Sequence, residues 1–184
     1  MQLVTIFLIT TAMLVLKNLL SPMIIYELYG IIGAIYIYLN KRENAKLNAG
    51  KSCVIGISGG IVVFLFGFLI TLLMSLIFGG ETAEVQKADV LKAVIMTGVI
   101  PAVCEELFFR GMLQTGLERM TDSRKTIIIT SLIFAVFHLP PIKIPAMLIA
   151  GAVFGFVYNK TGRLSAAMLA HAVNNCIAVV VMNV

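Results

Sequence analysis

Two carboxylates and a guanidinium lie close together in an otherwise apolar stretch, CEELFFRG at residues 104–111. On a helix, Glu106 and Arg110 are four residues apart and nearly share a face, whereas Glu105 points about 100° away. We therefore expect Arg110 to pair with Glu106, which reduces the cost of placing both charges in an apolar setting. Glu105 keeps no local counter-ion, and a carboxylate of this kind is suited to proton transfer near neutral pH.

Both histidines of the chain also lie in apolar segments, His138 after FAVF and His171 before AVNN. Counted along their segments at about 1.5 Å per residue, Glu105, His138 and His171 fall within tolerance of one layer. Phe134 lies one helical turn before His138 and can shield the imidazole from lipid, and Asn175 lies one turn after His171. Ionisable groups clustered at one depth favour chemistry at a single bond over a relay across a membrane.

The composition shows that this cluster sits in an integral membrane protein. Hydrophobic residues make up 60% of the 184 residues, charged residues only 12%, and the mean hydropathy is +1.01, whereas soluble proteins average about 25% charged residues. We predict an all-α fold, a multi-pass transmembrane helical bundle forming one domain over 1–184, with the motif-bearing core at about 91–182. Apolar runs long enough to cross a bilayer give seven candidate spans: 3–20, 22–39, 53–78, 91–118, 126–139, 145–159 and 164–182.

Some of these spans carry signals of irregular structure or close packing. The first two meet at the breaker pair Ser21-Pro22, and the fifth and sixth are short and bracketed by prolines, so a partly re-entrant segment is an alternative there. Pro101 removes the amide that would bond the Thr97 carbonyl, which predicts a kink beside the charged cluster. Two GxxxG pairs, at residues 56 and 60 and at residues 151 and 155, predict close helix packing.

The basic residues indicate topology and not nucleic-acid binding, because they lie in short linkers and form no aromatic-interleaved patch. Nine of the 14 fall in alternate linkers: Lys41, Arg42, Lys46, Lys51, Arg119, Arg124, Lys125, Lys160 and Arg163. The positive-inside rule therefore predicts a multi-pass protein of the cell membrane with these linkers in the cytosol. The opposite side holds Lys17, Lys87, Lys92 and Lys143, together with Glu81, Glu84 and Asp89. The first apolar run lacks a basic start and a cleavage site, so we expect a retained span.

The three cysteines, Cys53, Cys104 and Cys176, are widely spaced in apolar stretches, which argues against a disulfide framework or a zinc cluster. Cys104 and Cys176 adjoin the motifs, so a cysteine nucleophile is one alternative. Neighbours in a helix point about 100° apart, however, which turns them away from the predicted site.

The order E-E-x-x-x-R, F-x-x-x-H and H-x-x-x-N on successive apolar helices resembles the CPBP family, the CAAX-protease and bacteriocin-processing intramembrane endopeptidases, also called Abi proteins. The pattern covers about residues 101–175. It is carried by Glu105, Glu106, Arg110, Phe134, His138, His171 and Asn175. Members of this family commonly have eight helices, so the resemblance implies eight spans where the apolar runs give seven.

The resemblance implies hydrolysis of a peptide bond in a membrane-associated peptide or protein, with no cofactor preferred. Glu105, helped by His138, would activate water, and His171 and Asn175 would stabilise the oxyanion. Glu106 and Arg110 would orient the site.

Other functions remain alternatives. Glu105, His138 and His171 also make the donor set of a catalytic zinc site. From a different class, the same residues would suit a non-catalytic scaffold that gives immunity to a toxic peptide, or an ion or proton translocator.

Overall fold

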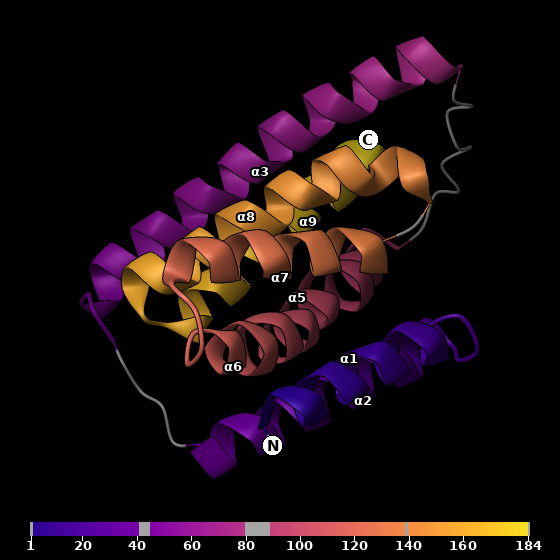
Figure 1. Cartoon of the computed structure of the whole chain (residues 1–184). Coiled ribbons are helices and arrows are strands. Elements are labelled where there is room, and N and C mark those ends of the chain that lie inside the picture. The colour runs from indigo at the N-terminus through magenta and orange to yellow at the C-terminus, as the bar shows by residue number, and fades with distance from the viewer. Residues whose placement is uncertain (1, 41–44, 80–88, 139, 184) are drawn as a thin grey trace.

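In the computed structural model, which describes residues 2–40, 45–79, 89–138 and 140–183, the described chain forms seven helical rods and no strand (Figure 1). The predicted all-α membrane bundle is thus confirmed, with seven rods and not eight in this part of the chain. Six rods are α1 (Gln2–Leu16), α2 (Pro22–Asn40), α3 (Ala49–Phe78), α7 (Ser123–Phe137), α8 (Ile144–Thr161) and α9 (Leu164–Asn183). Four described helical segments are long and apolar enough to cross a membrane: Pro22–Asn40, Ala49–Phe78, Pro141–Thr161 and Leu164–Met182.

The remaining rod carries the charged motif and is composite. It runs through α4 (Val90–Ala93), the π-helical segment η1 (Val94–Val99), α5 (Ile100–Glu106), a second π-helical segment η2 (Leu107–Gln114) and α6 (Thr115–Leu117). Single π-helical turns inside helices are often found at functional sites. The sequence predicts a kink beside Pro101, and at this place the structure has a π-helical segment, η1, that ends just before this proline.

Capping residues set where several rods begin and end. The Asn48 side chain accepts a hydrogen bond from the Lys51 amide at the start of α3, and Asp122 accepts from the Arg124 and Lys125 amides at the start of α7. α8 ends at Thr161 and is followed by its C-cap Gly162, whose φ of 65° is a left-handed conformation that favours glycine. A short 3₁₀ turn, η3 (Pro141–Lys143), precedes α8.

The rods pack through small residues, as the GxxxG pairs predicted. A Cβ at Gly56 would lie 2.7 Å from the Ala166 carbonyl oxygen, and one at Gly60 would meet the Ala170 carbonyl oxygen, so α3 presses against α9. A Cβ at Gly151 would lie 2.9 Å from the Ser131 Cα, which brings α8 onto α7. Such close approach compensates for the lack of a hydrophobic driving force between helices in lipid.

The described basic linkers gather at one end of the bundle, where α2 ends, α3 begins, α7 begins and α8 turns into α9 (Figure 1). The turn between α1 and α2 and the turn between α7 and α8 lie at the other end. This arrangement follows the alternation expected from the positive-inside rule. Lys41, Arg42, Glu81, Glu84 and Lys87, which also entered that prediction, lie outside the described residues.

Candidate active site

The predicted ion pair lies at the centre of the bundle. Arg110 Nη1 contacts Glu106 Oε1 at 3.0 Å, and both side chains are fully buried. Arg110 Nη2 donates to the Gly151 carbonyl oxygen of α8 at 2.8 Å, and its guanidinium carbon lies 4.9 Å from the centre of the Phe134 ring. The arginine is therefore held by a carboxylate, a backbone carbonyl and an aromatic face, as a buried charge requires.

His171 from α9 is tied to this pair. Its Nδ1 lies 2.9 Å from Glu106 Oε1, and its ring stacks on Phe154 with centroids 4.6 Å apart. In the neutral imidazole, Nδ1 then carries the proton that Glu106 accepts, which leaves the Nε2 lone pair free. That Nε2 lies 4.0 Å from Glu105 Oε2.

His138, the residue directly after α7, is oriented in the same way by a different acceptor. Its Nδ1 lies 2.7 Å from the Phe134 carbonyl oxygen, and its ring packs on the Phe134 ring with centroids 4.3 Å apart. With Nδ1 as donor, Nε2 again presents its lone pair. This Nε2 lies 3.4 Å from Glu105 Oε2, so Phe134 both covers and orients the imidazole.

Glu105 is thus the point on which both histidines converge. Its side chain is 7% exposed, and its Oε2 faces the two Nε2 atoms at 3.4 and 4.0 Å. One carboxylate oxygen and two imidazole lone pairs are all acceptors, so a shared proton, a water molecule or a cation would complete the arrangement. Three acceptors of this kind can bind a water molecule and remove its proton.

A cavity of about 150 Å³ connects Glu105 and His138 with the first two helices. Its walls are formed mainly by apolar and aromatic side chains of α2, η2 and α7. The lining residues are Lys17, Pro22, Ile25, Tyr26, Tyr29, Glu105, Phe109, Phe137 and His138. A cavity of about this size can hold a benzene-sized group, so one side chain of a peptide fits beside the carboxylate.

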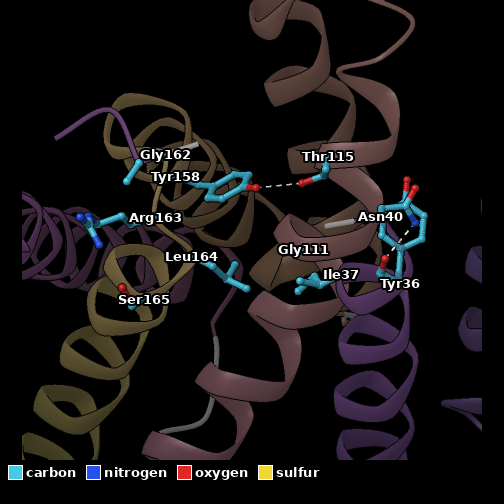
Figure 2. A pocket seen from close by; sticks show the side chains of 11 residues that line it. Tyr36, Ile37, Asn40, Gly111, Thr115, Tyr158, Gly162, Arg163, Leu164 and Ser165 are labelled. Atoms are coloured by element: carbon cyan, nitrogen blue, oxygen red, sulfur yellow. Dashed lines mark hydrogen bonds between the residues drawn. The ribbon is translucent and has the colours of Figure 1, made fainter. Parts of the chain in front are cut away.

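A larger cavity, of about 280 Å³, lies toward the end of the bundle that carries the basic linkers. Figure 2 shows its lining, with the Tyr158 and Thr115 hydroxyls joined at 2.9 Å across it. None of the residues predicted for catalysis lines this cavity. The smaller cavity is therefore the one that belongs to the candidate active site.

Asn175 is the predicted residue whose contacts differ most from expectation. Its Nδ2 lies 3.5 Å from the Thr97 carbonyl oxygen, and its Oδ1 accepts from the Asn174 side chain at 2.9 Å. The sequence predicted that Pro101 leaves the Thr97 carbonyl unpaired, but the Asn175 amide approaches it. A primary amide has two N–H groups, and Asn175 is not among the residues that line the cavity beside Glu105.

The structure also brings in residues that the sequence analysis did not select. Lys17, from the turn between α1 and α2, lines the cavity that holds Glu105. Its sequence signal is that it is the only basic residue in the first forty. Gln114 is fully buried next to the charged motif and donates to the Gly155 carbonyl oxygen at 3.2 Å.

The donor types of Glu105, His138 and His171 suit zinc, and both histidines have the Nδ1 acceptor that metal-bound imidazoles commonly use. Within the described part of the chain, however, no group of three or more His, Cys, Asp or Glu side chains has the arrangement of a metal site. Glu105, His138 and His171 are thus zinc ligands by chemical type, but their geometry in the described part of the chain is not that of a metal site.

Comparison with known proteins gives two matches. Residues 87–177, about half of the chain, match the family described as type II CAAX prenyl endopeptidase Rce1-like. Over 130 residues the chain is 27% identical to "Putative membrane peptidase YdiL" of Bacillus subtilis (strain 168), and this match covers 68% of the chain. It covers 49% of the relative, so the chain spans about half the length of that protein. No solved structure shows a significant match.

The matched segment contains the residues predicted for the site, from Glu105 to Asn175, whereas Lys17 and the α2 residues that line the cavity lie outside it. The three motifs occur within it in the order expected, on the composite rod, α7 and α9. These observations agree with one another and support the CPBP family of CAAX-protease-like membrane proteins for the half of the chain that matches.

Proposed function

We propose that this protein is an intramembrane endopeptidase that hydrolyses a peptide bond in a membrane-associated peptide or protein. The family match supports a membrane protease. The observation that carries the proposal is the Glu105 carboxylate, which faces two imidazole Nε2 atoms and lines a cavity inside the bundle. Water and a peptide segment have to meet at such a group for hydrolysis to occur within a membrane.

In this mechanism Glu105 accepts a proton from a water molecule while the water oxygen attacks the scissile carbonyl carbon. His138 helps because its Nε2 lies 3.4 Å from the carboxylate and can share the proton. When the tetrahedral intermediate collapses, the carbon–nitrogen bond breaks and the proton passes to the leaving amine. Glu105 then returns to its carboxylate form, and the protons balance over the cycle.

His171 and Asn175 are the proposed donors to the oxyanion. Because His171 Nδ1 is committed to Glu106, Nε2 can donate to the oxyanion only in the imidazolium form. Asn175 would use the amide N–H that does not face Thr97. Donors placed where negative charge develops stabilise the transition state.

Glu106 and Arg110 act as positioning residues in this scheme. Glu106 holds His171 through Nδ1, and Arg110 fixes Glu106 while also contacting α8 at Gly151. The composite rod, α8 and α9 are thereby joined through one buried network. Phe134 contributes the carbonyl and the ring that orient His138.

A zinc-dependent protease is the second candidate, because the orientation of His138 and His171 through Nδ1 also suits metal ligation. In that case Glu105, His138 and His171 would hold the ion, which would supply a bound water of lowered pKa. We prefer the metal-free mechanism, since Asn175 has no role as a zinc ligand and is a suitable oxyanion donor.

The proposal is tested by incubating the purified protein in lipid nanodiscs with candidate membrane peptides and identifying the fragments by mass spectrometry. The metal-free mechanism predicts cleavage that chelators do not inhibit. Asn175→Ala should lower kcat by about 10²–10³-fold with little change in KM. Asn159→Ala is the matched control, at the end of the bundle that carries the basic linkers, and should leave kcat unaltered. Stoichiometric zinc that is lost specifically in His171→Ala would contradict the metal-free mechanism.

Two outcomes would indicate a different function. Binding of a toxic peptide without cleavage would support an immunity or scaffold role. Proton or ion flux through proteoliposomes that depends on Glu105, again without cleavage, would support translocation. In our proposal the protein is a multi-pass protein of the cell membrane, and its cavity opens toward the end opposite the basic linkers.

A further inference from the structure

The cavity beside Glu105 carries a positive charge that the proposed hydrolysis does not use. Lys17 lies in the turn after α1, is half-buried, and lines the same cavity as Glu105 and His138. The two other described lysines at this end of the bundle, Lys92 and Lys143, are exposed. Lys17 is therefore distinguished from them by its position and burial.

The Lys17 ammonium forms no ion pair with any carboxylate in the described ranges. Its electrostatic neighbours are Glu105, which attracts it, and Lys143, which repels it. Lysines at helix ends usually reach into water with the ammonium while the stem covers apolar surface. A half-buried ammonium without a close counter-ion is a favourable place for an anionic group of a ligand.

The remainder of the cavity is suited to a peptide side chain. Tyr26 and Tyr29 of α2 and Phe137 of α7 provide aromatic walls in the cavity that Lys17 and Glu105 also line. At about 150 Å³ the cavity accommodates one side chain or one chain end. A group that reaches Lys17 through this space therefore belongs to a residue within one or two positions of the bond held at Glu105.

We propose that Lys17 is a specificity-determining residue, which binds a carboxylate of the substrate located next to the scissile bond. The carboxylate can come from an Asp or Glu side chain or from the chain terminus, because an ammonium recognises both through the same charge-assisted hydrogen bond. This inference rests on the proposed function for its substrate, so its test measures binding as well as cleavage.

The test uses three apolar peptides of one sequence: one with Glu at the position next to the cleaved bond and an amidated end, one with Gln and an amidated end, and one with Gln that ends there in a free carboxylate. If no peptide is cleaved, the Glu or Gln is placed at the centre of the peptide instead, and only binding is compared. Each is presented to the full-length protein in nanodiscs of neutral phosphatidylcholine. We measure Kd by fluorescence for all three peptides and kcat/KM for those that are cleaved.

We expect the wild type to prefer at least one of the carboxylate peptides over the neutral peptide by about 10–100-fold, as for a hydrogen bond to a charged group. Lys17→Met should reduce that ratio to about one, and Lys17→Arg should retain most of it. Lys17→Glu should reverse the preference, so that the neutral peptide binds more tightly than the carboxylate peptides. Lys92→Met removes an exposed charge from the same end of the bundle and should leave the ratio unchanged. Which carboxylate peptide is preferred identifies the source of the group.

A wild-type protein without the preference, or a Lys17→Met variant that keeps it, would overturn the inference. Failure of the proposed function is distinguishable, because it would appear as a Lys17-dependent difference in Kd without any cleavage. Cleavage without a carboxylate preference would uphold the proposed function and reject the role of Lys17.

Discussion

Helix α3 and the composite rod cross the same bundle but are held in it by different forces. Of the thirty residues of α3 only four are buried, namely Ser52, Gly56, Gly60 and Val63. In η2, seven of the eight residues are buried, Arg110 among them. One helix exposes large apolar side chains to lipid and contacts its neighbours through small ones, whereas the other buries its charges at the centre.

The difference shows that hydropathy alone does not determine the place of a helix in a membrane bundle. Lipid tails are as apolar as leucine, so α3 gains from close packing against α9 and not from escaping water. The composite rod gains from satisfying its charges, since a carboxylate or guanidinium facing lipid is costly. Each region should therefore fail under a different kind of substitution.

The largest effect on stability is expected for Arg110→Ala. This change leaves Glu106 fully buried without the guanidinium 3.0 Å away and also removes the bond to Gly151. Breaking a buried pair from one side costs about 3–5 kcal/mol, so the variant should unfold at a much lower temperature in detergent. Arg124→Ala removes an exposed arginine and should stay within about 0.5 kcal/mol of the wild type. Equal thermal stability of the two variants would contradict the role of the buried pair.

An intermediate effect is expected in α3, where two glycines provide a matched comparison. A Cβ at Gly60 would lie 2.7 Å from the Val173 Cβ and would also press on the Ala170 carbonyl, whereas a Cβ at Gly67 meets nothing within 4 Å. We expect Gly60→Ala to cost about 1–3 kcal/mol through overpacking and Gly67→Ala to change stability by less than about 0.5 kcal/mol. The measurement is unfolding by denaturing detergent, and a similar loss in both variants would show that α3 does not dock through Gly60.

The smallest effect is expected at the start of α3. Asn48→Ala removes the side-chain acceptor for the Lys51 amide, and loss of an N-cap costs about 1 kcal/mol. Asn48→Asp keeps an acceptor there and should be close to the wild type. The free energy of unfolding measured for both variants checks this expectation. A loss in the Asp variant as large as that in the Ala variant would argue against capping.

The sequence predicted the rods well because two local features define them. These are the length of an apolar run and the helix-breaking residues beside it, and both can be read from neighbouring residues. Ser21-Pro22, for example, correctly marks the junction before α2. The spacing of Glu106 and Arg110 likewise predicted their pairing, since residues four apart on a helix are neighbours. The convergence of His138 on Glu105 followed from comparing depths along two rods.

Other contacts were not predictable because they depend on how separate rods meet. The contact of Asn175 with Thr97 requires the π-helical register of η1 and the close packing of α9 against it. The bond between His171 and Glu106 requires the rotation of two helices about their axes. Lys17 reaches the cavity only because its turn folds next to Glu105, and nothing in its neighbouring residues indicates this.

The most direct test of the proposed chemistry compares Glu105→Gln with the wild type in cleavage of a membrane peptide by purified protein. Glutamine keeps the volume of the side chain but cannot accept the proton of water, so the rate should fall by about 10²–10⁴-fold or below detection. The amount and thermal stability of folded protein should remain near those of the wild type. Glu27→Gln, an exposed change on α2, should be fully active. Undiminished cleavage by Glu105→Gln would contradict the assignment of Glu105 as the base.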